Sequence, residues 1–441
     1  MERCVFKYLY NFIHDNDILT PSQSGFRPND STVNQLLSIT SDFYRALDQG
    51  KEVRIVFFDI SKAFDQVWHR GLLFKLQNIG IDGGLLKWFK SYLYRRKQRV
   101  VIHWVMSDVV EIQSGVPQGS ILGPLLFLVY INDLVTDIEC EIKLFADDTS
   151  LYVVVENPYT SALQINRDLI KINEWACRWL VTFNPNKTEC LTISNNIKKP
   201  FHPSLIFDDI YLQEVEAHKH LGVILANNLS WNLHVNEILS KGYSRLSMLR
   251  NVKFILDRKT LQTIYFSFIR PVLEYADAVW DNIPDYLADK IESLQLEAAR
   301  IVSGGNRMAS KNLLYKETGW VTLSKRRENH RIIHFHKIYH KKSPNYLCDN
   351  IQDRNQQYNT RQSNLVQEIR TRTQFYYNSF FPSTIRLWNN LPPTIQNNPS
   401  LHKLKSYLNS YQSKIPNYFY VGSRLGQVLH SKLRLECSSL K

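Results

Sequence analysis

The feature that most restricts the fold is a short, almost unbroken apolar run, Val53–Ile60, which carries one acid, Asp59, near its end. A run of this length and composition fits a strand that is buried on both faces. Apolar periodicity predicts helices over residues 30–50 and 119–137, and alternation predicts a β-hairpin over 142–155. Strands separated by helices in this order predict an α/β sheet with helices on one side.

Two further acids, Asp147 and Asp148, lie at the expected tip of that hairpin. Hard divalent cations such as Mg²⁺ prefer oxygen ligands. Two such ions about 3.5–4 Å apart can stabilise both the attacking and the leaving oxygen of a phosphoryl displacement. Carboxylates on neighbouring strands, with Asp59 as the third, could supply that site. Each motif alone also has a structural explanation, because aspartate at a turn often bonds its own backbone and Asp59 could cap a helix.

Between these acids lies a glycine- and proline-rich segment, Ser114–Pro124, just before the second expected helix. Glycines there let the backbone approach a ligand, and the N–H groups that begin a helix can point at it. The alternative is a plain loop before a helix. The segment contains neither the Gly-Lys-Ser/Thr of a phosphate-binding P-loop nor the Gly-x-Ser-x-Gly of a nucleophile elbow.

The composition favours a polyanionic partner. The chain has 441 residues, enough for two or three domains, and a formal net charge of +13. Such a charge more often indicates nucleic acid than a membrane surface. The six cysteines form no Cys-x-x-Cys pair, and the longest apolar stretch, Leu125–Ile131, is too short to span a bilayer. With no signal-peptide pattern at the start, we expect a soluble, intracellular protein of the nucleus or the cytoplasm.

Three motifs in this order resemble the palm of reverse transcriptases. They are Phe-x-Asp-x-x-x-Ala-Phe-Asp at Phe57–Asp65, Gly-x-Pro-Gln-Gly-Ser-x-Leu-Gly-Pro at Gly115–Pro124, and Phe-Ala-Asp-Asp at Phe145–Asp148. The residues of these motifs are similar to those in reverse transcriptases of LINE-type retrotransposons related to Jockey, which lack long terminal repeats. The resemblance extends over nearly the whole chain through four further segments: Gln23–Arg27, Asn184–Thr188, His220–Val223 and Phe380–Asn389.

The resemblance implies an RNA-directed DNA polymerase that uses a two-metal mechanism to extend a DNA primer on an RNA template. Asp59, Asp147 and Asp148 match the family's metal ligands, and the expected cofactor is two Mg²⁺ or Mn²⁺ ions. Asp65 belongs to the first motif, where we expect a structural role such as capping. The expected partners are RNA template, DNA primer and deoxynucleoside triphosphates, with no membrane, and protein partners are left open.

The same matches imply a nucleotide pocket. Phe64 corresponds to the bulky residue that crowds the sugar 2′ position, and Gln118 with Gly119 corresponds to the lining of the pocket. Lys187 matches a lysine near the leaving pyrophosphate.

The implied fold is an α/β right-hand polymerase palm with partial fingers over residues 1–225, a helical thumb over 226–305 and a basic, helical C-terminal region over 306–441. Leu221 and Gly222 match the primer grip. In the family, a further fingers segment precedes the helix found here at residues 2–14, so the resemblance implies an N-terminally truncated enzyme. Two alternatives remain: a catalytically silent nucleic-acid-binding remnant of the polymerase fold, and an intron-maturase-like splicing helper.

Other side chains are weaker candidates. Four histidines at helical spacing could hold a metal, although a solvated basic face is the more ordinary interpretation: His330, His334, His336 and His340. The basic runs Arg95–Arg99 and Lys325–Arg327 are either solvated or contact phosphates. Pro382, Pro392 and Pro393 predict irregular structure near the end of the chain.

Overall fold

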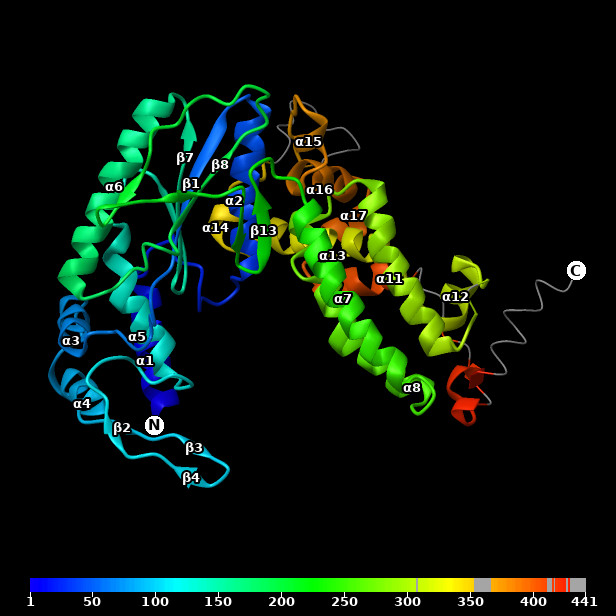
Figure 1. Cartoon of the computed structure of the whole chain (residues 1–441), viewed down its shortest axis with the longest axis horizontal. Coiled ribbons are helices and arrows are strands. Elements are labelled where there is room, and N and C mark those ends of the chain that lie inside the picture. Colours follow the sequence, from blue (N-terminus) through cyan, green and yellow to red (C-terminus); the bar gives the residue numbers. More distant parts are fainter. Residues whose placement is uncertain (307, 353–365, 411–414, 416, 426, 429–441) are drawn as a thin grey trace, which may run out of the picture. The chain divides into compact units, whose positions relative to one another are not determined.

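The chain forms two units in a computed structural model (Figure 1) that describes residues 1–306, 308–352, 366–410, 415, 417–425 and 427–428. The first unit comprises Met1–Gln35 and Gln49–Leu221, and the second comprises Leu36–Asp48 and Gly222–Lys441. Cys437 lies outside the described residues. Within the described part, no helix is both long enough and apolar enough to cross a bilayer.

A five-stranded sheet organises the first unit. Its strand order is β11-β8-β1-β7-β6. The strands are β1 (Glu52–Phe58), β6 (Glu141–Phe145), β7 (Asp148–Val155), β8 (Glu189–Ile193) and β11 (Gln213–Glu214). All neighbours are antiparallel except β11, which is parallel to β8. Every residue of β1 is buried, which confirms the strand buried on both faces that the apolar run predicts.

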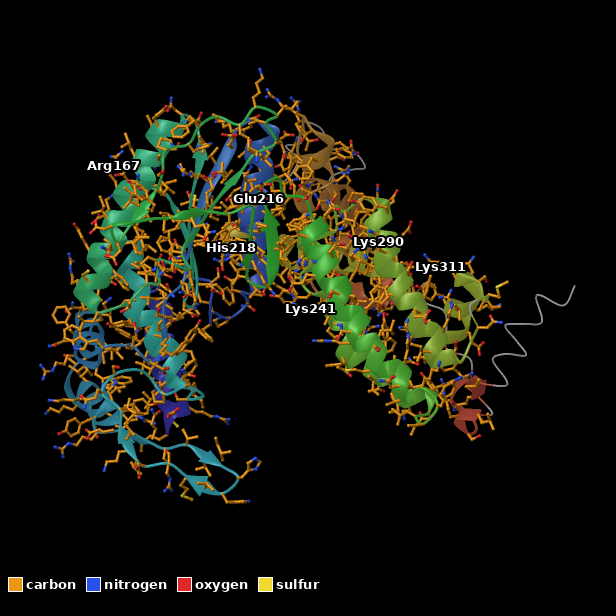
Figure 2. All side chains as sticks on the ribbon, viewed as in Figure 1. Arg167, Glu216, His218, Lys241, Lys290 and Lys311 are labelled. Atoms are coloured by element: carbon orange, nitrogen blue, oxygen red, sulfur yellow. The ribbon has the colours of Figure 1, made fainter. Side chains whose placement is uncertain are left out.

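Helices cover the face of the sheet to which Val56 and Phe58 of β1 contribute apolar side chains. In Figure 1, α5 and α6 flank the sheet, and in Figure 2 Arg167 on α6 points away from it. The helices of this layer are α1 (Glu2–Asp15), α3 (His69–Asn78), α4 (Gly83–Leu93), α5 (Leu122–Ile131), the 3₁₀ turn η1 (Asn132–Val135) and α6 (Pro158–Trp179). The helix expected over 119–137 is therefore α5 with η1, and it begins three residues later than expected. The delay arises at Ser120, whose hydroxyl accepts a hydrogen bond from the Gly123 N–H at 2.9 Å.

Short two-stranded ribbons complete the first unit. The longest of these antiparallel segments runs from Lys97 to Glu111, and we call it the arm. Its root pairs β2 (Lys97–Gln98) with β5 (Val110–Glu111), and its outer part pairs β3 (Val101–Ile102) with β4 (Val105–Met106). The remaining short strands are β9 (Ile206–Phe207), β10 (Ile210–Tyr211) and β12 (Ala217–His220).

The second unit is mostly helical. Helix α2 (Thr32–Asp48) falls within the predicted range 30–50, and most of its residues belong to this unit. Lys241 on α7 and Lys290 on α11, both exposed, are labelled in Figure 2. The remaining elements are β13 (Val223–Ala226), α7 (Asn232–Val252), α8 (Arg258–Ile264), the π-helical turn η2 (Tyr265–Ile269), α9 (Arg270–Glu274), α10 (Asp277–Trp280), α11 (Asp285–Ser303), α12 (Lys311–Thr318), α13 (Leu323–Tyr339), α14 (Asn345–Cys348), α15 (Gln374–Tyr377), α16 (Phe380–Asn389), α17 (Pro393–Gln396), α18 (Leu401–Asn409) and η3 (Asn417–Tyr420).

The prolines near the end of the chain do not mark irregular structure, and that prediction is wrong. Pro382 is the third residue of α16, and Pro393 is the first residue of α17 with Pro392 directly before it. The first turn of a helix tolerates proline, because the N–H groups there have no partner within the helix.

Candidate active site at the edge of the sheet

Three aspartates lie together where β1 ends and β7 begins. Phe58 is opposite Thr149 in the antiparallel register, so the next residues along, Asp59 and Asp148, leave the sheet side by side. Although part of Asp148 is exposed, desolvation by the surrounding protein, followed by the negative charges of Asp147 and Asp59, raises the pKa of its carboxyl to about 6. We call these three residues the aspartate edge.

The turn that carries Asp147 is held from outside the hairpin. Ala146 begins the turn with a φ of 55°, a conformation that residues with a Cβ seldom adopt. The side chain of Gln23, only 2% exposed, compensates for this strain. Its Oε1 accepts hydrogen bonds from the N–H groups of Ala146 at 3.0 Å and Gly25 at 2.7 Å. Its Nε2 donates to the Ala146 carbonyl at 3.5 Å.

The backbone around Gln23 also pairs with the hairpin. Ser24 N–H donates to the Leu144 carbonyl at 2.8 Å, and Leu144 N–H donates to the Ser22 carbonyl at 2.9 Å. A Cβ added at Gly25 would lie 2.2 Å from the Ala146 nitrogen, so only glycine fits there. Residues 23–27 carry part of the family resemblance, but the sequence did not predict that Gln23 supports the turn before Asp147. Gln23 and Ala146 are 123 residues apart, so no local sequence pattern could have predicted their contact.

The first and second motifs pack directly on each other. Gly115 N–H donates to the Val67 carbonyl and Val116 N–H to the Phe64 carbonyl, both at 2.8 Å. A Cβ on Gly115 would lie 2.8 Å from the backbone of Asp65. The Asp65 carboxylate accepts a hydrogen bond from Gln118 Nε2 at 2.9 Å. Asp65 therefore has a structural role, as expected, but it is not a helix cap, because no helix begins there; it orients Gln118.

Phe64 and Gly119 differ in how firmly they are held. The Phe64 ring stacks on Phe127 of α5, with centroids 4.7 Å apart, and meets Phe26 edge-on at 6.1 Å. These contacts fix the ring while leaving part of it exposed. Gly119 is exposed with a φ of 80°, and no atom lies within 4 Å of an added Cβ. Its neighbour Ile121 donates its N–H to the Glu2 carboxylate at 2.9 Å, so a side chain of this chain occupies that donor.

Lys187 lies beside the aspartate edge. Its Nζ is 3.7 Å from Asp59 Oδ2. The loop reaches this place because Asn184 N–H donates to the Asp59 carbonyl at 2.8 Å and Ile60 forms a bridge with Phe183. Lys187 is 67% exposed, so its ammonium group can approach a phosphate without leaving water entirely.

Leu221 and Gly222 form a turn and are not part of the aspartate edge. Both have left-handed backbones, with φ of 46° and 82°. They connect β12 to β13 at the point where the first unit ends and the second begins. A Cβ on Gly222 would lie 2.9 Å from the Tyr275 ring, so glycine is needed for both backbone and space.

Four of the other candidates from the sequence have structural partners: His330, His336, Arg326 and Arg327. His330 Nδ1 lies 2.6 Å from Asp277 Oδ2, and His336 Nε2 bonds the Asn398 carbonyl at 2.9 Å. Arg326 pairs with Glu274 and Arg327 with Asp281. These side chains stabilise the helical unit through internal pairs, and Arg327 is too buried to meet a phosphate. The Arg95–Arg99 run, in contrast, is at the root of the arm and largely exposed.

The donor chemistry of the aspartate edge suits a hard divalent cation, since carboxylate oxygens are its preferred ligands. Among the described residues, no group of three or more His, Cys, Asp or Glu side chains is arranged so that it could hold a metal ion. The charge of the edge still fits a cation, because Asp148 is subject to the negative charges of both Asp59 and Asp147. A positive ion among the three would relieve that repulsion.

Comparisons of the sequence with known proteins show the family of the chain. Residues 1–225 match the family model described as "Reverse transcriptase (RNA-dependent DNA polymerase)". The chain is 27% identical over 334 residues to the "Probable RNA-directed DNA polymerase from transposon X-element" of Drosophila melanogaster, covering 73% of this chain and 36% of the relative. It is 32% identical over 300 residues to the "RNA-directed DNA polymerase from mobile element jockey" of Drosophila funebris, covering 64% and 32%.

These alignments also set the scale of the chain, which spans about a third of the length of the relatives it matches. Among solved structures, apo telomerase from Candida tropicalis matches at 11% identity with a TM-score of 0.41, covering 79% of this chain and 55% of that one. That likeness is too weak to support a functional statement.

Proposed function

The chain belongs to the reverse transcriptase family, and we propose that it is the RNA-directed DNA polymerase of a LINE-type retrotransposon, extending a DNA primer on an RNA template. One observation carries the proposal: Asp59, Asp147 and Asp148 meet at one edge of the sheet, within the matched residues. The names of the relatives, which describe polymerases of mobile elements, support the same activity.

Members of this family use divalent metal ions, and the aspartate edge would hold two Mg²⁺ or Mn²⁺ ions here. When bound, such ions supply charge stabilisation to both the attacking and the leaving oxygen. The chain's own contribution is to hold the three carboxylates in place. Gln23 fixes the turn before Asp147, and β1 fixes Asp59 through a fully buried strand. Phosphoryl transfer depends mainly on positioning and charge, so this rigidity is the relevant property.

The nucleotide would lie between the first two motifs. Phe64, fixed by Phe127, would exclude a ribose 2′-hydroxyl by its bulk. Gln118, oriented by Asp65, and the open backbone of Gly119 would line the base and sugar side. Lys187 would supply positive charge to the leaving pyrophosphate from its position beside Asp59.

We propose the remaining assignments from the resemblance. Residues 1–225 would be palm with partial fingers, 226–305 the thumb and 306–441 a basic C-terminal region. Leu221 and Gly222 would contribute to the primer grip, because their tight turn presents backbone rather than bulky side chains. RNA, DNA primer and deoxynucleoside triphosphates would be the ligands, held chiefly through phosphate contacts and helix shape.

A primer-extension assay tests the proposal. The purified chain, given an RNA template, a DNA primer, deoxynucleotides and Mg²⁺, should lengthen the primer. Asp147→Asn should abolish extension, whereas Glu174→Gln, at an exposed carboxylate on α6, should not. No extension by the wild-type chain, with primer-template binding intact, would instead support a catalytically silent binding protein.

A further inference from the structure

The arm ends in an almost fully solvated tryptophan. Trp104 is 93% exposed, and it shares the tip with His103. The two residues have φ of 69° and 47°, so a tight two-residue turn holds the indole at the extreme end of the ribbon. From Lys97 to Trp104 the ribbon reaches about 23 Å at the usual rise per residue. Figure 2 shows side chains standing out from both faces of this ribbon.

Positive charge is concentrated on the helix before the arm and at the root of the arm. Residues 83–107 contain no Asp or Glu and six basic residues: Lys87, Lys90, Arg95, Arg96, Lys97 and Arg99. The rest of the arm adds two acids, Asp108 and Glu111, so residues 83–111 have a net charge of +4 in a chain whose net charge is +13. None of the six forms a salt bridge with a described residue. Arg96 is partly occupied within the protein, since its guanidinium donates to the Tyr92 carbonyl at 3.4 Å and lies over the Tyr92 ring. The other five side chains are exposed, so their charge is available to an external anion.

A cavity of about 780 Å³ lies at the root of the arm. Its lining combines cations with aromatic rings, among them Arg70, Lys87, Lys90, Arg95 and Phe74. Glu111 is the one acid in the lining. Cations beside aromatic surface suit phosphates and bases together, whereas an apolar protein partner would leave these charges buried without partners.

We propose that the arm and its root cavity form a binding site for single-stranded RNA, separate from the aspartate edge. Trp104 stacks on an unpaired base, because only single strands offer their base faces freely. The cations of the root contact the phosphates that follow. The inference rests on the proposed function, since it names where the template strand is held before it is copied. A second copy of this chain is the competing occupant of the arm's exposed apolar residues.

Binding of a short oligouridylate to the whole chain, measured by fluorescence anisotropy, tests the role of each part. Trp104→Ala should weaken binding about tenfold, the effect of losing one stacked base, and Trp104→Phe should recover most of it. The matched control is Tyr159→Ala, which removes an exposed aromatic ring from α6. Equal affinities for Trp104→Ala and Tyr159→Ala would overturn the proposal.

Salt dependence separates stacking from phosphate contact. Replacing Arg95, Lys97 and Arg99 by Ala should lower the slope of log affinity against log salt by about two, from three lost contacts to a single strand. Trp104→Ala should leave that slope unchanged. Lys198→Ala with Lys199→Ala, in an exposed loop, is the charge control. An unchanged slope in the arm variant would contradict the proposed phosphate contacts.

Cross-linking locates the RNA directly. An oligomer containing 4-thiouridine, irradiated with the wild-type chain, should attach to a peptide from the arm. Attachment only elsewhere, or a sedimentation change showing that Trp104→Ala breaks a dimer, would overturn the inference. If the RNA does not cross-link to the arm but primer extension is normal, the polymerase assignment is still supported. RNA binding that depends on the arm, together with no primer extension, would contradict the polymerase assignment but support the RNA-binding site.

Discussion

Two hairpins of the first unit are built alike and held differently. Both turn over two residues: Ala146 and Asp147 in the β6–β7 hairpin, where Ala146 has a left-handed backbone, and His103 and Trp104 in the arm, where both do. Gln23 accepts a hydrogen bond from the backbone of the β6–β7 tip, and Gly25 packs closely against the same tip. The tip of the arm contacts solvent, and Trp104 is its most exposed residue.

The difference indicates two functions for one local motif. A strained turn fixed by buried hydrogen bonds can hold a carboxylate in one position, which catalysis by positioning requires. A turn with few buried contacts opens and moves at low free-energy cost, which suits a surface that meets a variable strand. The comparison predicts that substitutions at the β6–β7 hairpin change chemistry and stability, and that substitutions in the arm change binding alone.

The largest expected effect is at the aspartate edge. Asp59→Asn should abolish divalent-cation binding, since it removes one of three carboxylates whose mutual repulsion favours a positive ion. Electron paramagnetic resonance with Mn²⁺ measures this without any enzymatic turnover. Asp108→Asn in the arm is the control and should bind Mn²⁺ like the wild type. If both variants bind Mn²⁺ equally well, the cation does not bind at the aspartate edge.

The second effect concerns the support of the turn. Gln23→Met keeps the volume but leaves the N–H groups of Ala146 and Gly25 without an acceptor. We expect a loss of about 1–3 kcal/mol in the free energy of unfolding, measured by urea denaturation. The rate of primer extension should fall about 10- to 100-fold as Asp147 shifts. Gln98→Ala, exposed in the arm, is the control; the same small change in both would show that Gln23 does not position the turn.

The third effect concerns sugar selection. If Phe64 lies under the nucleotide's C2′, Phe64→Val should raise ribonucleotide relative to deoxynucleotide incorporation about tenfold, or roughly 1.4 kcal/mol of discrimination. Competing nucleotides in one extension reaction measure the ratio. Phe201→Val, an exposed ring far along the sequence, controls for loss of an aromatic residue. An active Phe64→Val enzyme with an unchanged ratio would make Phe64 a packing residue only.

The smallest effect is on stability in the arm. Trp104→Ala should change the free energy of unfolding by less than about 0.5 kcal/mol, because a solvated side chain stabilises little. Leu144→Ala, fully buried in the β6–β7 hairpin, should cost about 2–5 kcal/mol. Urea denaturation of both variants gives the contrast. A large loss in Trp104→Ala would mean that the arm packs on another part of the protein.

The elements that the sequence predicted best are those with a strong apolar period. The continuous run Val53–Ile60 could hardly be anything but a buried strand, and β1 occupies Glu52–Phe58. The alternation over 142–155 likewise became β6 and β7. Helix starts were predicted less accurately. Helix α5 begins only after a turn in which the Ser120 hydroxyl accepts a hydrogen bond from the Gly123 N–H. Local pattern fixes such elements, whereas their ends depend on single side-chain hydrogen bonds.

The contacts that assemble the site were harder to anticipate. Asp65 has the structural role that was expected, but through a bond to Gln118 rather than as a cap, and Gln23 bonds Ala146 across the sheet edge. Neither contact is local in sequence, so no periodicity reveals it. The charge of Arg326 and Arg327 suggested phosphate binding, yet Glu274 and Asp281 neutralise it within the helical unit. Composition shows how much charge a chain has, and only packing shows which charges remain available.

The most direct test compares the aspartate edge with the arm in a single primer-extension experiment over a wide range of RNA template concentration. Asp59→Asn should lower kcat about a thousandfold or more at every template concentration, because it acts on the chemical step. Trp104→Ala should raise the KM for template and recover the wild-type kcat when RNA is saturating. If Asp59→Asn keeps its kcat at saturating RNA, the aspartate edge is not the active site.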